Sequence, residues 1–394
     1  MTDQLPSDAA PAPVVGEGPT PRMSVLKFVS DDGRTVELEP HDGRQFDVKP
    51  LSFAELVHAA ETTNPTFAVS LGNARAPVSE TGLEKDGPLT VNTTMSNNGP
   101  VIAFGLVKGG WLPMPWAHKR VAWVDRNVVI ALEKLKSDVE GEASPGDPAW
   151  LAKWLGVDTE EVSPILFALE GSQRRPPTDF DMRAELGRAS KALARLMPGA
   201  KVQTVNSQQR KALLRLVLDN AESRARATRL LMQAAPLVVH REKPERRGLL
   251  ETKVLELARQ EGVRLSSLTV LALLSCIYDA NPAISTHRAA TPGRAVLKPK
   301  AAFTREDAYN ALTDLYFVEL LLNAHAAFPD IQPVLYTRDV GIAAMWAVLQ
   351  PGELTTEHLP KGRFRTTTTF NLTTGLFPAL SEAEVIDLKG RLLL

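Results

Sequence analysis

The sequence predicts an α/β protein built around a mainly parallel sheet. Two segments, residues 121–129 and 334–341, are each an apolar, β-branched or aromatic run that ends in an Asp and then changes to a helical pattern. Most of the periodicity between them is helical, as expected for helices that connect parallel strands. The composition, 44% hydrophobic and 23% charged over 394 residues, is typical of globular proteins and allows two or three domains.

The first hundred residues differ in pattern from the rest of the chain. Residues 1–21 are rich in Pro, Ala and acidic side chains and lack periodicity, which predicts a disordered tail. Residues 22–100 are predicted to form a β-containing extension, with short strands over 24–48, a short helix over 52–61, and an irregular connector or further strands over 62–98. This pattern is compatible with a small separate domain and with an elaboration of the main one.

The α/β domain is predicted over residues 101–350. Residues 121–124 predict a buried strand and 128–136 the helix that follows it, with Asn127 as a candidate N-cap. Further helices are expected over 159–170, 180–196, 207–234, 249–261, 266–278, 304–327 and 342–349. Thr159, Ser207 and Thr304 are candidate N-caps, and Pro198-Gly199, Pro236 and Gly262 are stop signals. Strands are expected over 201–205, 237–240 and 333–337, and a Pro-containing loop over 279–300. Residues 351–394 are expected to form a tail docked on the body, with a strand at 366–369 and a helix at 381–389.

Charge is distributed unevenly along a chain whose formal net charge is −1. Residues 171–260 carry 19 Lys and Arg against 9 Asp and Glu, a net charge of +10. This excess is compatible with a face that binds an anion and equally with solvated helix surfaces. The candidate contacts to a nucleic-acid phosphate backbone are Arg224, Arg226, Arg229, Arg246 and Arg247.

Cysteine use and hydropathy predict a protein of the cytoplasm without a membrane partner. The single cysteine, Cys276, lies in an apolar helical run, which excludes a disulfide framework and fits a reducing compartment. No apolar stretch is long enough to span a membrane, and the N-terminus has no signal-peptide pattern. The seven histidines lack zinc-ligand spacing, and neither a glycine-rich phosphate loop nor a Gly-x-Ser-x-Gly elbow occurs. These patterns disfavour zinc sites, nucleotide-binding loops and α/β-hydrolases.

Four acidic residues are candidates for a metal site. Asp125 and Asp339 follow the two strands, and α/β sheets carry their chemistry at the carboxyl ends of parallel strands. Glu170 ends a predicted helix, while Asp314 lies on another, with Asn310 one turn earlier on the same face. Because hard divalent cations take oxygen ligands, converging carboxylates suit Mg²⁺ or Mn²⁺. Without a metal, such carboxylates repel one another and some of their pKa values rise.

Three short motifs resemble those of the PIN-domain and PIN-like nucleases. They are Val124-Asp125-Arg126-Asn127, Tyr309-Asn310-Ala311-Leu312-Thr313-Asp314 and Tyr336-Thr337-Arg338-Asp339. The resemblance covers about residues 120–350 and implies a three-layer, doubly wound α/β fold. It also implies that Asn127 and Thr337 position the site through hydrogen bonds, and that the metal ligands, in chain order, are Asp125, Glu170, Asp314 and Asp339.

The spacing of the acids departs from that of compact members of this family. The 144-residue step from Glu170 to Asp314 requires an insertion, which helices over about residues 207–300 would supply. Glu251 and Glu256, on a predicted helix nearer to Asp314, compete with Glu170 for its role.

These observations together predict a divalent-metal-dependent nuclease that hydrolyses phosphodiester bonds, in RNA first and in DNA less often. Asp125, Asp314 and Asp339 would hold Mg²⁺ or Mn²⁺, with Glu170 as a fourth ligand or the base that orients water. The alternative is a non-catalytic binding or assembly scaffold on the same fold, in which Asp125 and Asp339 are ordinary helix N-caps. An inhibitory or assembly protein partner is compatible with the sequence, which assigns no oligomeric state.

Overall fold

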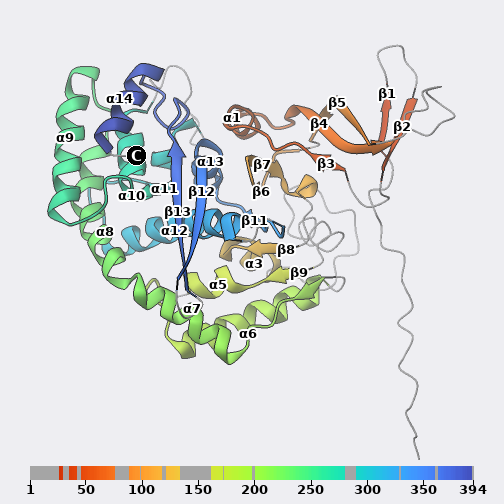
Figure 1. Cartoon of the computed structure of the whole chain (residues 1–394), viewed down its shortest axis with the longest axis horizontal. Coiled ribbons are helices and arrows are strands. Elements are labelled where there is room, and N and C mark those ends of the chain that lie inside the picture. The colour runs from red at the N-terminus through yellow and green to blue at the C-terminus, as the bar shows by residue number, and fades with distance from the viewer. Residues whose placement is uncertain are drawn as a thin grey trace, which may run out of the picture.

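The computed structural model describes residues 26–29, 35–41, 46–75, 88–97, 99–117, 121–133, 161–171, 173–197, 200–279, 290–327, 330–359 and 363–392. A β-rich N-terminal part lies at one end of the molecule, and helices dominate the other (Figure 1). The predicted tail, residues 1–21, lies outside the described residues. Among the helices of the described segments, none combines the length and apolar character needed to cross a membrane.

The N-terminal part is an antiparallel sheet with one helix, α1 (Phe53–Glu61). β4 (Thr66–Arg75) is its central strand and pairs with β2, β3 and β5. Along β4 the residues alternate between buried and more exposed, as in a sheet with one face on a core. The strands predicted over 24–48 are therefore present, and of the two alternatives for residues 62–98 the described part has the strands. The remaining strands are β1 (Leu26–Val29), β2 (Thr35–Pro40), β3 (Asp47–Val48) and β5 (Leu89–Ser96).

Aromatic contacts join this sheet to the main body. Phe67 of β4 packs edge to face against Trp111 and Trp116, with ring centroids 5.9 and 5.7 Å apart. The Trp111 indole donates a hydrogen bond to the Ser52 carbonyl at 2.8 Å, and its backbone bridges to Leu51. Since these residues belong to one hydrophobic cluster, the N-terminal part shares its core with the main body.

The main body contains a six-stranded mixed sheet in the order β10–β9–β8–β11–β6–β7. Strands β10, β9, β8 and β11 are parallel, β6 runs antiparallel to β11, and β7 runs antiparallel to β6. From β8 the chain adds β9 and β10 on one side, and then returns to place β11 on the other. The gap between the carboxyl ends of β8 and β11 is therefore a topological switch point. The bounds are β6 (Phe104–Val107), β7 (Gly110–Pro113), β8 (Val121–Val124), β9 (Glu161–Ser163), β10 (Lys201–Val202) and β11 (Val334–Thr337).

Helices pack around this sheet, and further helices form one side of the molecule (Figure 1). α13 (Val340–Val348) contacts β6, β7 and β11, while α5 (Ile165–Glu170) contacts β8 and α3 (Arg126–Glu133) contacts β11. The predicted α/β class is thus confirmed at this level. The other helices are η1 (Met114–Trp116), α6 (Asp179–Leu196), α7 (Ser207–Asp219), α8 (Ala221–Ala234), η2 (Ala235–Val238), α9 (Pro244–Gln260), α10 (Leu268–Ile277), α11 (Pro292–Leu297), α12 (Arg305–Ala327) and α14 (Glu382–Leu392).

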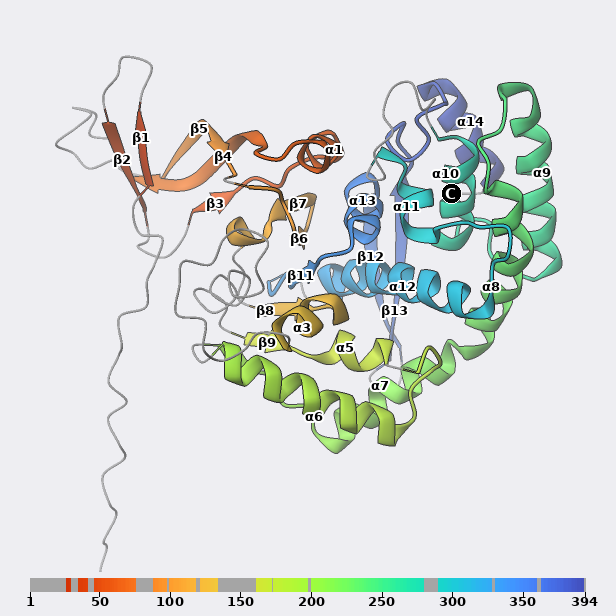
Figure 2. The same cartoon turned by 180° about the vertical axis from the view of Figure 1, so that it is seen from behind.

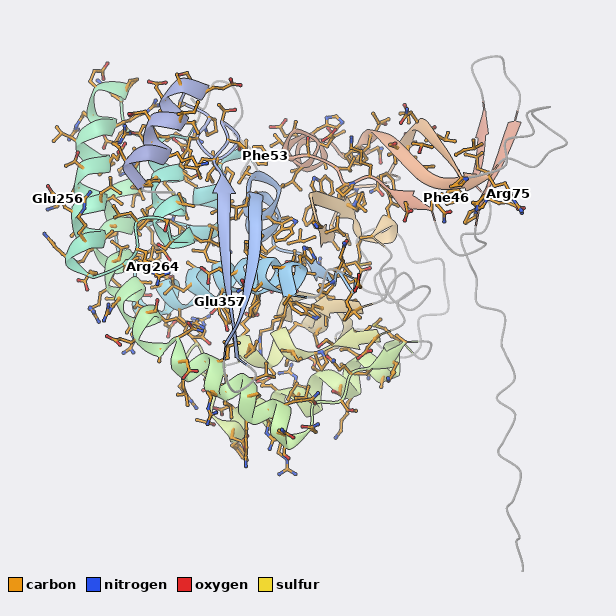
Figure 3. All side chains as sticks on the ribbon, in the orientation of Figure 1. Phe46, Phe53, Arg75, Glu256, Arg264 and Glu357 are labelled. Atoms are coloured by element: carbon orange, nitrogen blue, oxygen red, sulfur yellow. The ribbon has the colours of Figure 1, made fainter. Side chains whose placement is uncertain are left out.

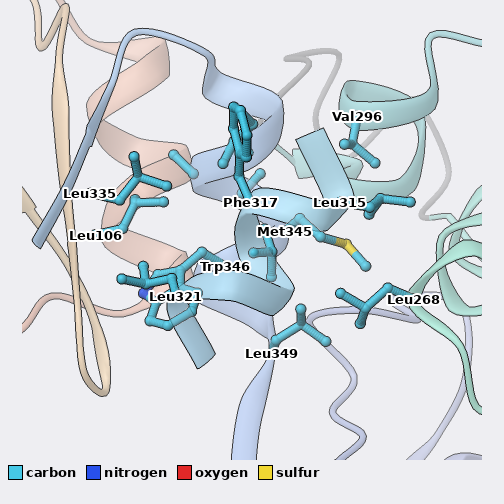
Figure 4. Packing of buried hydrophobic residues seen from close by; sticks show 14 of the residues in the cluster. Leu106, Leu268, Val296, Leu315, Phe317, Leu321, Leu335, Met345, Trp346 and Leu349 are labelled. Atoms are coloured by element: carbon cyan, nitrogen blue, oxygen red, sulfur yellow. The ribbon is translucent and has the colours of Figure 1, made fainter. Parts of the chain in front are cut away.

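The core of the helical side forms around α10, α12 and α13. Every residue of α10 is buried, including Cys276, and burial raises the pKa of that thiol to about 12, as expected for a structural cysteine. Phe317 and Leu321 of α12 lie beside Met345 and Trp346 of α13 (Figure 4). The Trp346 indole also donates to the carbonyls at both ends of the β6–β7 turn. α13 therefore couples the sheet to the helices.

The C-terminal segment lies on these helices. A hairpin of β12 (Gln350–Leu359) and β13 (Arg363–Asn371) crosses α12 and contacts it (Figure 2). α14 follows a Ser381–Glu384 capping box and is anchored to α9, because Arg391 Nε lies 3.0 Å from the Glu251 carboxylate.

Five predicted local structures are wrong. The helix expected over 159–170 starts only at Ile165, since Glu161–Ser163 pairs with β8 and β10 as a strand. The helix over 207–234 is interrupted at Asn220, which ends α7 and begins α8. Residues 237–240 contain no strand, because η2 with Pro236 in its first turn occupies Ala235–Val238. The loop over 279–300 contains α11, and Asn127 is not the N-cap of α3, because Asp125 caps that helix.

Candidate metal centre

Asp125 lies at the carboxyl end of β8 and begins α3. Its backbone N–H donates to the Tyr336 carbonyl at 3.1 Å, which extends the β8–β11 pairing to the end of the strand. One carboxylate oxygen caps α3 by accepting the Val128 N–H at 2.8 Å, and the other accepts the Thr337 hydroxyl. Asp125 is 1% exposed. These hydrogen bonds fix the direction of a buried carboxylate.

Asp339 occupies the equivalent place after β11 and begins α13. Its Oδ1 atom accepts the N–H groups of Gly341 and Ile342 at 2.6 and 3.3 Å, and so caps the helix. Its Oδ2 atom accepts a hydrogen bond from the Lys298 ammonium at 2.9 Å. Both oxygens of Asp339 are therefore engaged.

Thr337 connects the two strand-end acids. Its hydroxyl donates to Asp125, and the hydroxyl oxygen accepts the Asp339 N–H at 2.9 Å. Thr337 is fully buried. A single side chain thus orients Asp125 relative to the start of α13.

Glu170 and Asp314 complete a group of four acids, here named the acidic cluster: Asp125, Glu170, Asp314 and Asp339. Glu170 is the last residue of α5, and Asp314 lies within α12. The charges of Asp125 and Asp339 act on both, and the charge of Glu170 acts on Asp314. Four elements that are distant in sequence therefore bring four carboxylates within electrostatic reach.

The pKa values of three of these acids are raised in the protein without metal. Burial is the largest cause in each case, and repulsion by neighbouring carboxylates adds to it. The pKa of Asp125 rises to about 6, although the hydrogen bonds from Thr337 and Val128 lower it. The pKa of Glu170 rises to about 8, and that of Asp314 lies well above its ordinary value. The negative charges of the acidic cluster are thus only partly neutralised by neighbouring cations.

Two further side chains act on Glu170, and the sequence assigned a role to neither, although both stand in the motifs quoted for the resemblance. The Tyr309 hydroxyl of α12 lies 2.7 Å from the Glu170 carbonyl oxygen and 3.0 Å from that of Arg175, and so ties the end of α5 to α12. The Arg126 guanidinium stacks over the Phe167 ring at 4.5 Å, and its charge lowers the pKa of Glu170. Arg126 directly follows the strand-end Asp in sequence, and that was the available clue.

Glu251 and Glu256 lie apart from the acidic cluster, on α9. Glu251 is buried, accepts the Tyr278 hydroxyl and forms an ion pair with Arg391 of α14. Glu256 is exposed on the outer surface of α9 (Figure 3). Of the three glutamates considered, Glu170 is the one placed with the aspartates.

The predicted supporting amides differ from Thr337 in their surroundings. Asn127 is exposed in the first turn of α3, and Asn310 is exposed on α12, one turn before Asp314. Neither is held in the interior as Thr337 is. The supporting hydrogen bonds to the strand-end acids thus come from Thr337 and from backbone N–H groups.

The five arginines predicted to contact nucleic acid lie on α8 and α9. Arg224 is half-buried: it donates to Thr313 at 2.9 Å and stacks over the rings of Tyr309 and Tyr316. Arg247 is also half-buried. The other three form surface ion pairs, namely Arg226 with Glu222, Arg229 with Glu261 and Arg246 with Glu242.

The chemistry of the donor set suits a hard divalent cation. The acidic cluster offers carboxylate oxygens, and a positive ion would offset the repulsion that raises their pKa values. As the described residues are placed, no three His, Cys, Asp or Glu side chains are arranged to enclose a metal ion. Binding would therefore require the carboxylates to move closer together.

No protein-family model, curated protein or solved structure matches this chain.

Proposed function

We propose that this chain is a divalent-metal-dependent nuclease with a PIN-like, doubly wound three-layer core, which hydrolyses phosphodiester bonds in RNA, with DNA as the second candidate substrate. The observation that carries the proposal is the convergence of four acids from four elements at the switch point of the sheet. Open α/β sheets bind their ligands at such points. The order of the acids and their strand or helix contexts agree with the family resemblance.

Asp125, Asp314 and Asp339 would hold Mg²⁺ or Mn²⁺, which supplies an activated water and stabilises the leaving oxygen when bound. Thr337 keeps the Asp125 carboxylate in a fixed direction. With its pKa raised to about 8, Glu170 holds a proton at neutral pH in the metal-free protein. Once a neighbouring cation lowers that pKa, Glu170 is free to act as a ligand or to orient water as a base.

The basic helices support a nucleic-acid substrate. The side chains of Arg226, Arg229 and Arg246 are 42, 55 and 72% exposed, so their guanidinium groups can reach a phosphate. Leaving their surface ion pairs costs each of them about 0–1 kcal/mol. Arg224 and Arg247 are more enclosed and would contribute mainly through their charge.

The test is calorimetric titration of Mn²⁺ at low salt into the wild type and Asp125→Asn/Asp339→Asn. We expect binding by the wild type and its loss in the double variant, followed by metal-dependent cleavage of RNA in wild-type samples alone. The matched control is Asp219→Asn/Asp387→Asn, which removes two carboxylates outside the acidic cluster and should bind Mn²⁺ as the wild type does. Wild-type protein that binds no Mn²⁺ would refute the nuclease proposal.

A specific observation also favours the non-catalytic scaffold. Asp125 and Asp339 both cap helices, which gives each a structural role that needs no metal. On this second proposal Asp125→Asn/Asp339→Asn would have no metal-dependent phenotype, since Asn caps a helix about as well as Asp does. The same titration separates the proposals, because only the nuclease requires Mn²⁺ binding.

A further inference from the structure

We propose that Lys298 is the resident counter-cation of the acidic cluster and exchanges with the divalent ion, so that metal binding at Asp339 releases the ammonium. This inference rests on the proposed metal site and adds a residue that no motif assigned to it. It concerns how the cluster is neutralised before the metal arrives.

The first support is the way in which Asp339 is occupied. Its Oδ1 atom accepts two backbone N–H groups at the start of α13, so Oδ2 is the oxygen that can bind a cation. That atom lies 2.9 Å from Lys298 Nζ. A metal ion that takes Asp339 as a ligand must therefore displace the ammonium or share the oxygen with it.

The second support is that Lys298 acts on more than one acid. Its positive charge lowers the pKa of Asp314, against the larger effects of burial and of Asp339. The ammonium is therefore placed where its charge reaches two of the proposed ligands at once.

The third support is that the backbone delivers Lys298 to this place. Lys298 ends α11 in the left-handed conformation, with φ 52° and ψ 53°, which is uncommon for a residue with a side chain. α11 is fixed against the start of α13: a Cβ atom on Gly341 would lie 2.5 Å from the Ala295 carbonyl oxygen. The contact between the two helices thus leaves no room for even a methyl group, and it sets Lys298 beside Asp339.

The fourth support is accessibility. The Lys298 side chain is 48% exposed, whereas the Asp339 side chain is 16% exposed. The ammonium can therefore swing into water while the carboxylate stays in place. Arg126, another cation that acts on the cluster, lies near Glu185 and has a 12% exposed side chain, so it has no comparable route into water.

The experiment compares Mn²⁺ titrations of the full-length wild type, Lys298→Met and Lys300→Met. Lys300 is a matched control, since it lies two residues away and pairs at 2.9 Å with Asp307, outside the acidic cluster, and its side chain is 53% exposed. We expect Lys298→Met to bind Mn²⁺ about tenfold more tightly, because a competing positive charge is removed from the site. Lys300→Met should change the affinity less than twofold.

A second measurement does not involve metal. In EDTA, thermal unfolding of Lys298→Met, Asp339→Asn and the combined variant should show coupling, with the double variant losing less than the sum of the single losses. Additive losses would overturn the counter-cation role.

The outcomes separate this inference from the proposed function. Wild-type binding with no gain in Lys298→Met, or with an equal gain in Lys300→Met, would overturn exchange and leave the nuclease proposal standing. Absence of Mn²⁺ binding in all three proteins would overturn both.

Discussion

Two buried aspartates in this molecule differ in how their charge is balanced. Asp279 is 2% exposed, and its Oδ2 atom accepts hydrogen bonds from Arg241 Nε at 2.8 Å and from Arg294 Nε at 2.5 Å. Arg294 also donates to four carbonyl groups, those of Val238, Val239, His240 and Cys276. Asp125 is as deeply buried, but it is hydrogen-bonded to uncharged groups and lies within reach of other carboxylates.

The difference distinguishes a structural acid from one that can take a ligand. The guanidinium groups of Arg241 and Arg294 neutralise the buried charge of Asp279, so no ion from solution is needed. The hydrogen bonds to Asp125 do not fully offset the free-energy cost of burying its charge, and its pKa rises to about 6. An incompletely neutralised, hydrogen-bonded group of acids is therefore the better indicator of a site than burial alone.

The largest effect is expected for Arg294→Met. The variant leaves Asp279 with Arg241 alone and removes the donor from four carbonyl groups. Breaking such a buried pair costs about 3–5 kcal/mol, to be measured as a lower free energy of unfolding in urea. Arg246→Met, at an exposed ion pair, is the control and should stay within about 0.5 kcal/mol of the wild type. A loss below about 1 kcal/mol at Arg294 would remove the structural side of the comparison.

An effect of opposite origin is expected when pH is varied in EDTA. The pKa values of Asp125 and Glu170 are raised from 3.8 and 4.5 to about 6 and about 8, so the folded state holds protons that the unfolded state has lost. Stability should therefore fall as pH rises from about 4 to 8, because the unfolded state loses these protons at lower pH than the folded state does.

Asp125→Asn should flatten this fall, most strongly between about pH 4 and 6. It should also move the Glu170 part to lower pH, because the Asp125 charge raises the pKa of Glu170. Asp179→Asn provides a control of opposite sign, since Arg210 lowers the pKa of that exposed carboxyl. An unchanged profile in Asp125→Asn would show that Asp125 carries no burial cost.

The smallest effect separates two neighbouring arginines of α8. Arg224→Gln should cost about 1–2 kcal/mol of stability, because its hydrogen bond to Thr313 and its contacts with two tyrosine rings are lost. Arg226→Gln should change stability by less than about 0.5 kcal/mol. For RNA binding we expect the larger effect at Arg226, the more exposed of the two. Arg226→Gln should reduce the slope of log affinity against log salt by about 0.7 per lost contact. An Arg226 variant with an unchanged slope would exclude that residue from the phosphate-binding face.

The parts of this molecule that sequence patterns predict are those with strong local determinants. The Thr304–Asp307 capping box is present as expected and fixes where α12 begins, and hence where Asp314 lies. The matching strand–Asp–helix segments lead to adjacent parallel strands, since the ends of such strands meet at one edge.

The remaining features depend on long-range contacts that no local pattern encodes. β9 has three residues, too few to show a period, and it exists because Val162 and Ser163 are buried beside β8. α11 is short and lies in a segment with several prolines, so Lys298 at its end carried no sign that it reaches Asp339. The hydroxyl of Tyr309 finds the Glu170 carbonyl across 139 residues of sequence.

The pairing of β8 with β11 also has a consequence for synthesis. Asp125 and Thr337, which this pairing brings into contact, are separated by 212 residues. At a translation rate of about 5–20 residues per second, β11 is made about 10–40 s after β8. During that interval the β8 edge lacks the strand that covers it in the folded protein, and open edges pair readily with other chains. Assembly of the acids is therefore a late event in the synthesis of the chain, and the yield of folded protein should depend on how well ribosome-bound chains are kept apart.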